Sequence, residues 1–166
     1  MNPWLKTLLV VALVAGAVVV TGTAASADTT DDEVARQYNE TMWYFVPVLG
    51  QYASEIDRTV AAVEVKPELA ARLAELAYRG EYMVYDLEGS TPPGEMARAH
   101  ELLVFALRQL NEAAQIGSED PDGAQYMVET YKPVFDGARQ EIRAWLTVRM
   151  EIGGAGLAPV VVAAGQ

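Results

Sequence analysis

Apolar residues along most of the chain recur at steps of three and four, which is the spacing of one face of an α-helix. The pattern divides into four stretches and predicts helices over residues 31–64, 67–88, 92–116 and 121–151. The longest apolar stripe belongs to the first of these helices: Val34, Tyr38, Met42, Phe45, Leu49, Tyr52, Ile56, Val60 and Val63. No alternation typical of a strand competes with it, so the sequence predicts an all-α fold.

Capping residues, prolines and glycines mark the ends of the predicted helices. Residues 30–33, Thr-Asp-Asp-Glu, fit a capping box at the start of the first helix. Pro67 and Pro121 suit the first turn of a helix, where a missing amide hydrogen is not needed. Gly89 and Gly117 stand where helices are expected to stop.

Short turns between amphipathic helices favour antiparallel neighbours, so we expect an up-down-up-down four-helix bundle over residues 28–152. An alternative is a three-helix fold in which Pro133 breaks the last helix. Residues 153–166 are uncharged and begin with glycines, and we expect a flexible C-terminal tail there. A short added strand or a partner-binding peptide is the alternative for this tail.

The first 27 residues have the three-part layout of a secretory signal peptide. A short leader carries Lys6, residues 7–20 are uncharged and apolar, and an Ala-Ser-Ala triplet at 25–27 offers a cleavage site before Asp28. The alternative is an uncleaved transmembrane anchor, because the uncharged span 7–27 has about the length of ~20 residues that a membrane helix needs. Either interpretation places the bundle outside the cytoplasm, whether secreted, periplasmic or at the cell surface.

Composition narrows the classes of partner. With 166 residues, 51% of them hydrophobic, the chain suits one domain with a single core. The formal net charge of -11 repels phosphate backbones, so nucleic acid is not an expected partner. Membrane contact is expected only through residues 7–27, if they are retained. The chain has no cysteine, which excludes disulfides, thiolate metal sites and a lipid-modified N-terminal cysteine.

Two prolines inside predicted helices point to the middle of the bundle. In an antiparallel arrangement, Pro47 and Pro133 fall at similar heights, and each removes one backbone hydrogen bond and bends its helix. Gly80 projects to about the same level and is expected to permit the close approach of another helix or a bulky ring. The candidate mid-bundle pocket is formed by Trp43, Phe45, Pro47, Gly80, Tyr82, Phe105, Tyr131 and Phe135. The alternative, which we favour, is that these aromatic rings fill the space.

His100 is the only histidine, and it lies on the apolar seam of the third predicted helix. A single histidine excludes carboxylate-bridged di-iron sites with two Glu-x-x-His motifs, and we expect no metal site. Haem needs only one histidine and one methionine, so His100 and Met42 are candidate ligands of a haem or other flat cofactor. Cytochrome b562-like bundles, which the layout resembles in general terms, place the histidine on the last helix. We therefore expect a hydrogen-bonded histidine near a helix start, and no cofactor.

Three tyrosines, Tyr78, Tyr82 and Tyr85, form a second stripe beside the seam of the second helix. Tyrosine combines an apolar body with a hydrogen-bonding tip, which suits a binding face. Such stripes more often pack between helices, so we expect core packing.

No motif for catalysis is present. The sequence contains no Gly-x-Ser-x-Gly, phosphate loop or dinucleotide fingerprint, and adjacent carboxylates occur at helix starts rather than facing each other. The acidic turn 119–122 lacks the spacing of a calcium loop, and Asp120 is better explained as a helix cap. We do not expect an enzyme.

Residues 91–103, Thr-Pro-Pro-Gly-Glu-Met-Ala-Arg-Ala-His-Glu-Leu-Leu, carry a further pattern. Their Pro-Pro, Glu, His and Leu-Leu positions resemble a motif of some exported bacterial helical-bundle proteins that have no assigned activity. The resemblance covers about a dozen residues of the third helix and implies export and a bundle. Many of those proteins are lipoproteins, and the absence of cysteine departs from that pattern.

These observations favour a non-enzymatic, extracytoplasmic binding or interaction module, associated with the cell envelope, for an unknown protein or a small apolar ligand. An exposed aromatic patch or an open apolar pocket would support it. The alternatives are a carrier of haem or another flat cofactor and a membrane-tethered spacer domain.

Overall fold

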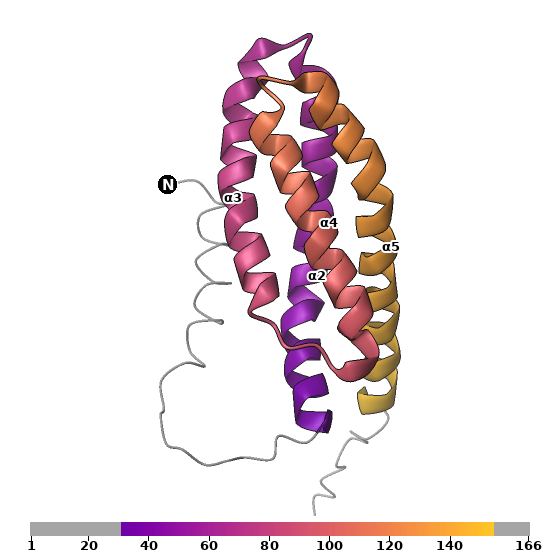
Figure 1. Cartoon of the computed structure of the whole chain (residues 1–166). Helices are drawn as coiled ribbons and strands as arrows, with labels where there is room; N and C mark the ends of the chain where they lie inside the picture. The colour runs from indigo at the N-terminus through magenta and orange to yellow at the C-terminus, as the bar shows by residue number, and fades with distance from the viewer. Residues whose placement is uncertain (1–30, 155–166) are drawn as a thin grey trace, which may run out of the picture.

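The computed structural model describes residues 31–154, and in this range the fold is entirely helical. This range contains four α-helices: α2 (Asp31–Val63), α3 (Ala70–Glu88), α4 (Ala97–Ile116) and α5 (Pro121–Gly154), shown in Figure 1. Short 3-10 turns precede two of them: η1 (Pro67–Leu69) before α3 and η2 (Gly94–Met96) before α4. The all-α prediction is confirmed for the described residues. The expected signal peptide, most of the tail, and Thr30 of the capping box lie outside them.

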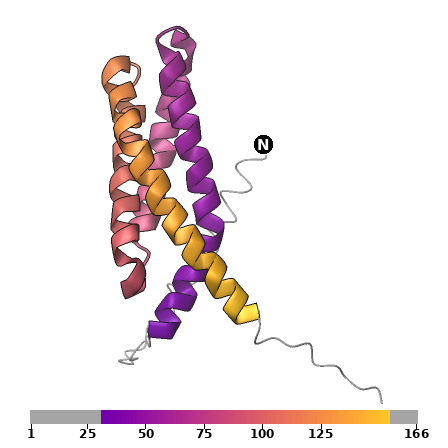
Figure 2. The same cartoon turned by 90° about the vertical axis from the view of Figure 1, so that its right-hand side faces the viewer.

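The four helices pack side by side as a bundle (Figure 1). The α2–α3 and α4–α5 connections lie at one end, and the α3–α4 connection lies at the other. Helix α4 packs against both α3 and α5, while α2 contacts all three of the other helices. Figure 2 shows that α5 runs obliquely across α2. The two long helices therefore share a surface on which residues far apart in the sequence meet.

Prolines and one aspartate explain where the helices begin. Pro67 and Pro121 stand at the first positions of η1 and α5, where a residue without an amide hydrogen leaves no bond unmade. Asp120 caps α5, since its Oδ1 accepts a hydrogen bond from the backbone amide of Gly123 at 3.0 Å. The predicted cap and first turn are confirmed.

Helices α2 and α5 continue through their internal prolines. Pro47 lies inside α2 and Pro133 inside α5, and α5 extends from Pro121 to Gly154. The three-helix alternative, in which Pro133 ends a helix, is therefore wrong. Both prolines are exposed, so the missing hydrogen bond of each falls where water is within reach.

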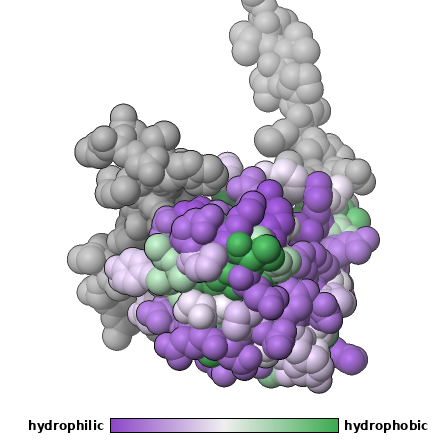
Figure 3. Space-filling view, turned by 90° about the horizontal axis from the view of Figure 1, so that it is seen from above, coloured by the Kyte–Doolittle hydropathy of each residue, from purple (hydrophilic) through white to green (hydrophobic). Residues whose placement is uncertain are grey.

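All four helices contribute to one apolar core. Its largest fully buried apolar side chains include Met42, Leu49, Ile56, Leu76, Leu87, Leu103, Leu107, Leu110 and Phe135. Figure 3 looks down on the end that holds the α2–α3 and α4–α5 connections, where hydrophilic residues surround a small hydrophobic patch. The core is thus covered mainly by polar residues at this end of the bundle.

A polar contact crosses the core beside Gly80 of α3. The Tyr52 hydroxyl of α2 shares its one hydrogen between two acceptors, Asn111 Oδ1 of α4 at 2.8 Å and the Leu76 carbonyl of α3 at 3.1 Å. A Cβ atom on Gly80 would stand 2.0 Å from both Asn111 Oδ1 and the Tyr52 hydroxyl. As the sequence predicted, glycine permits a close approach here.

The close approach at Gly80 leads to a prediction about stability. Gly80→Ala should lower the free energy of unfolding by about 1–3 kcal/mol, because an added methyl group displaces two hydrogen-bonding side chains from a packed site. Urea titration followed by far-UV circular dichroism measures this change.

Gly137→Ala is the matched control. Gly137 is a helical glycine of α5 with nothing within 4 Å of its added Cβ, so alanine there should stabilise the fold by up to about 1 kcal/mol through helix propensity. Equal stability changes in the two variants would contradict the role given to Gly80.

Candidate functional site

The eight residues of the candidate mid-bundle pocket do not gather in one cavity. Phe45, Gly80 and Phe135 are buried in the core. The other members point away from it: Trp43, Pro47, Tyr82 and Phe105 are exposed, and Tyr131 is half-buried. Equal height along antiparallel helices does not give a shared direction, because successive helical residues are rotated by about 100° around the axis. The pocket expectation is corrected on this ground.

The interior beside Gly80 is filled by side chains that the pocket prediction did not include. Tyr52 and Asn111 occupy it, and both are buried. The favoured alternative, that the aromatic rings fill the space, holds only for Phe45 and Phe135, because the other four rings are exposed or half-buried. Asn111 follows the seam residue Leu110 directly, so its burial is not visible in the apolar periodicity.

His100 is a buried, hydrogen-bonded residue near the start of α4. Its Nδ1 lies 3.1 Å from the Tyr38 hydroxyl, and the backbone of Leu87 also hydrogen bonds the imidazole. Burial lowers the pKa of His100 below its ordinary 6.5, which outweighs the opposing effects of Leu87 and Glu101. Met42, the other candidate haem ligand, is fully buried. These contacts engage the imidazole in the protein's own packing.

Tyr38 links His100 to an aromatic and charged cluster at the end of α5. The ring centroid of Tyr38 lies 5.9 Å from that of Trp145 in an edge-to-face arrangement. The indole Nε1 of Trp145 donates to Glu95, and the Arg149 guanidinium stands 5.0 Å from the Trp145 ring centroid. The cluster joins α2, α4 and α5 near the α3–α4 connection. We therefore assign it a role in packing these helices together.

The tyrosine face of α3, formed by Tyr78, Tyr82 and Tyr85, is exposed to solvent. The exposed fractions of these residues are 61%, 52% and 76%. The expectation of core packing is therefore wrong. The reason is rotation, because the tyrosines follow Leu76, Gly80 and Met83 by two positions each. Two positions correspond to about 200° around the helix, so the tyrosines point away from the core.

The two tyrosines nearest the α2–α3 connection form a preassembled pair. Their ring centroids are 5.1 Å apart in an edge-to-face arrangement, and the hydroxyl oxygens of Tyr78 and Tyr82 are 2.9 Å apart. The hydrogen bond with Tyr78 raises the pKa of the Tyr82 hydroxyl. Contact within the pair limits side-chain freedom before any partner binds, which reduces the entropy lost on binding.

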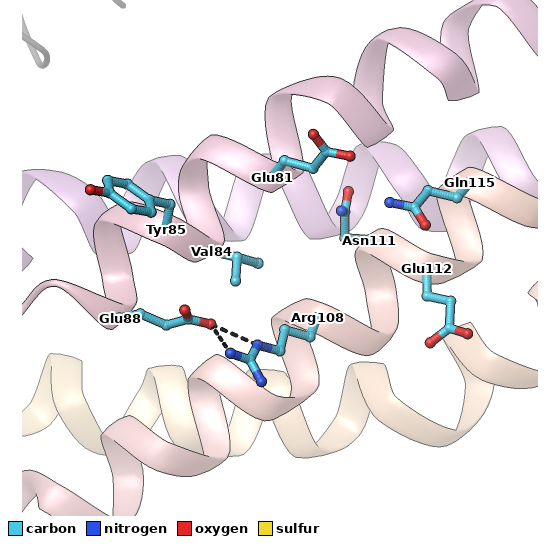
Figure 4. Close-up of a pocket in the computed structure, with 8 residues that line it drawn as sticks. All are labelled: Glu81, Val84, Tyr85, Glu88, Arg108, Asn111, Glu112 and Gln115. Carbon is cyan, nitrogen blue, oxygen red and sulfur yellow. Dashed lines mark hydrogen bonds and ion pairs between the residues drawn. The ribbon is translucent and has the colours of Figure 1, made fainter.

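An open groove of about 420 Å³ lies beside the tyrosine face, between α3 and α4 (Figure 4). The residues that line it are Glu81, Val84, Tyr85, Glu88, Arg108, Asn111, Glu112 and Gln115. Arg108 is the one cation among the described lining residues, and it is already paired, because its Nε donates to Glu88 Oε1 at 2.6 Å. The groove therefore has a net negative charge, and Tyr85 belongs both to it and to the tyrosine face.

Sequence reasoning found the tyrosines and missed the groove beside them. Helix α3 contributes Glu81 and Glu88, and the periodic pattern assigns both to its solvated surface. Their closeness to Glu112 depends on how α4 packs against α3. The signal available in the sequence was the pair of surface glutamates flanking Tyr85 on one helix.

Membrane spans and metal-binding groups were sought among residues 31–154. In this range no helix is long and apolar enough to cross a membrane. The same part of the chain contains no group of three or more metal-binding side chains placed to hold an ion. No protein-family model matches the chain, and no curated protein or solved structure matches it either.

The buried imidazole makes stability depend on pH. The folded-state pKa of His100 lies below 6.5, so the unfolded chain takes up a proton more readily as pH falls below that value. The stabilising difference is complete above about pH 6.5 and is lost toward the folded pKa, with a slope of at most ~1.4 kcal/mol per pH unit. His100→Gln should remove this contribution.

The measurement is urea unfolding of the wild type and His100→Gln at pH 7.5, 6.0 and 5.0. The wild type should lose more stability than the variant across this range, because other titrating groups are common to both proteins. A difference between them that stays constant with pH would show that His100 is protonated equally well in the folded state.

Proposed function

We propose that this protein is an extracytoplasmic helical-bundle module that binds a protein partner through the tyrosine face of α3. The observation that carries the proposal is the exposure of Tyr78, Tyr82 and Tyr85 on one helix surface. Tyrosine supplies a large contact area with two side-chain torsions and a hydrogen-bonding tip, and aromatic residues are enriched at the centres of interfaces. The three rings extend along α3 for about 10 Å.

The groove beside the face indicates the chemistry of the partner. Among residues 31–154, Glu81 and Glu112 have no ion-pair partner, and they line the same groove as Tyr85. Lysine and arginine side chains satisfy both components, since they pair with carboxylates and stack on aromatic rings. The partner surface should therefore present basic residues, and complementary charge should raise the association rate at low salt.

The location outside the cytoplasm is supported by the signal-peptide layout of residues 1–27. The up-down-up-down order of the helices is supported by connections at alternate ends of the bundle. In this arrangement α3 packs against α4 and α2, and its tyrosine face points away from them. An exported domain can associate with the cell envelope in two ways. It can bind a partner there, or it can keep residues 7–27 as a membrane anchor, which would make the domain a tethered spacer.

Processing of the N-terminus separates those two forms of association. N-terminal sequencing of the protein exported by its native host should give a start at Asp28. A start at Met1 in the membrane fraction would instead support the tethered form and rule out cleavage.

Site-specific photo-crosslinking in the native host tests the binding face. A photoreactive phenylalanine analogue in place of Tyr85 should give one discrete cross-linked protein, and its yield should fall at high salt. The same analogue in place of Tyr126, an α5 tyrosine that is 68% exposed, is the matched control. Identical products at the two positions, or none at Tyr85, would refute the proposed face.

Substitution of the tyrosines then measures their contribution. The triple change of Tyr78, Tyr82 and Tyr85 to alanine should weaken binding of the cross-linked partner by at least about 30-fold, since an anchoring tyrosine contributes roughly 2 kcal/mol. The double change of Tyr44 and Tyr126 to alanine, which also removes exposed rings, should leave the affinity unchanged.

A further inference from the structure

A second open groove lies on the surface that α2 and α5 share, with a volume of about 620 Å³. Its lining differs in charge from the rest of the protein. Among the residues that the structure describes, three arginines line it, Arg58 from α2 and Arg139 and Arg143 from α5, and no carboxylate does. The whole chain carries 23 acidic against 12 basic residues, so a carboxylate-free group of three arginines stands out from its composition. We call this site the arginine groove.

The Arg139 guanidinium packs against α2 at Gly50. A Cβ atom on Gly50 would stand 2.5 Å from one terminal nitrogen of Arg139 and 2.9 Å from its central guanidinium carbon. The guanidinium group therefore lies directly across α2 at the one position where that helix has no side chain. This contact gives Gly50, three residues after Pro47, a role in placing a charged group at the groove.

The charge of Arg139 is only partly neutralised. Its nearest carboxylate oxygen is Asp136 Oδ1, at 3.5 Å, and Asp136 also accepts a hydrogen bond from Lys132 at 2.7 Å. The Nε atom of Arg139 is buried and has no hydrogen-bond partner within the described part of the chain. The buried Nε is out of reach of a solute, but the weakly paired terminal nitrogens of Arg139 favour an additional anionic acceptor.

The other two arginines have donors to spare. Arg58 and Arg143 are exposed, and neither forms an ion pair with any residue between 31 and 154 that the structure describes. The Arg58 Nε donates to the Ser54 carbonyl at 3.1 Å, which orients its side chain along α2 and leaves its terminal nitrogens free for a ligand. Gln51, also in the lining, adds an amide.

We propose that the arginine groove binds a small molecule through a phosphate group. Guanidinium groups match the oxygens of a phosphate with paired hydrogen bonds, and a dianion balances most of a charge of three. The net charge of -11 acts against extended polyanions and anionic bilayers, so the ligand is a small phosphate-bearing solute. This site is separate from the tyrosine face, and either can exist without the other.

Thermal unfolding of the full chain in inorganic phosphate tests the site, with chloride at matched ionic strength as the reference. Ligand bound to the folded state raises the unfolding temperature along a saturating curve, whereas the general salting-in or salting-out effect of phosphate acts on every variant alike. The double variant Arg58→Gln/Arg143→Gln should weaken the fitted phosphate affinity by at least about tenfold. Both side chains are exposed, so its unfolding temperature in chloride should match the wild type.

The matched control is Lys66→Gln/Arg98→Gln, which removes the same charge from two exposed residues outside the groove. It should keep the phosphate dependence of the wild type. Equal phosphate dependence in all three proteins would overturn the proposal. Co-sedimentation with phosphatidylglycerol vesicles, in the absence of any response to free phosphate, would also overturn it, because the groove would then serve a lipid surface.

Discussion

The hydrogen bonds of Tyr52 beside Gly80 fix how three of the four helices fit together. The hydroxyl comes from α2, its two acceptors come from α3 and α4, and Gly80 gives them room. Burial raises the pKa of Tyr52 above its ordinary 10, so the hydroxyl keeps its proton. A shift of one helix by a turn would leave the Asn111 amide and this hydroxyl buried without partners, at a cost of about 1–3 kcal/mol each.

The helices and their starts were readable from the sequence because they depend on local information. Apolar steps of three and four define one face of each helix, and Pro121 with Asp120 defines a first turn whatever the helix packs against. The close approach at Gly80 could also be predicted, because glycine weakens a helix and its place on the apolar seam therefore indicates a packing role. The residues that fill the space at Gly80 could not be predicted. Tyr52 and Asn111 come from two other helices, and no local sequence pattern gives the height of one helix relative to another.

Surfaces were predicted less well, for a geometric reason. The tyrosines of α3 repeat with the same helical period as the core residues, so periodicity shows that they share a face without showing whether a neighbour covers it. Only the placement of α2 and α4 on the opposite side leaves Tyr82 and Tyr85 exposed.

The arginine groove could not be predicted from the sequence for another reason, since Arg58 and Arg139 lie on helices at opposite ends of the described chain.

The two grooves of the bundle carry opposite charges, and screening by salt limits how far each charge acts. At physiological salt the field of a surface charge falls off within about 8 Å, so a small anion touching the α2–α5 surface interacts mainly with Arg58, Arg139 and Arg143. An extended polyanion spans many such lengths and meets the acidic remainder of the surface as well. The glutamates line a groove between α3 and α4 and the arginines line one between α2 and α5, so a basic partner at Tyr85 contacts the glutamates and not the arginines. Net charge thus selects against large anions, while local geometry decides what each groove receives.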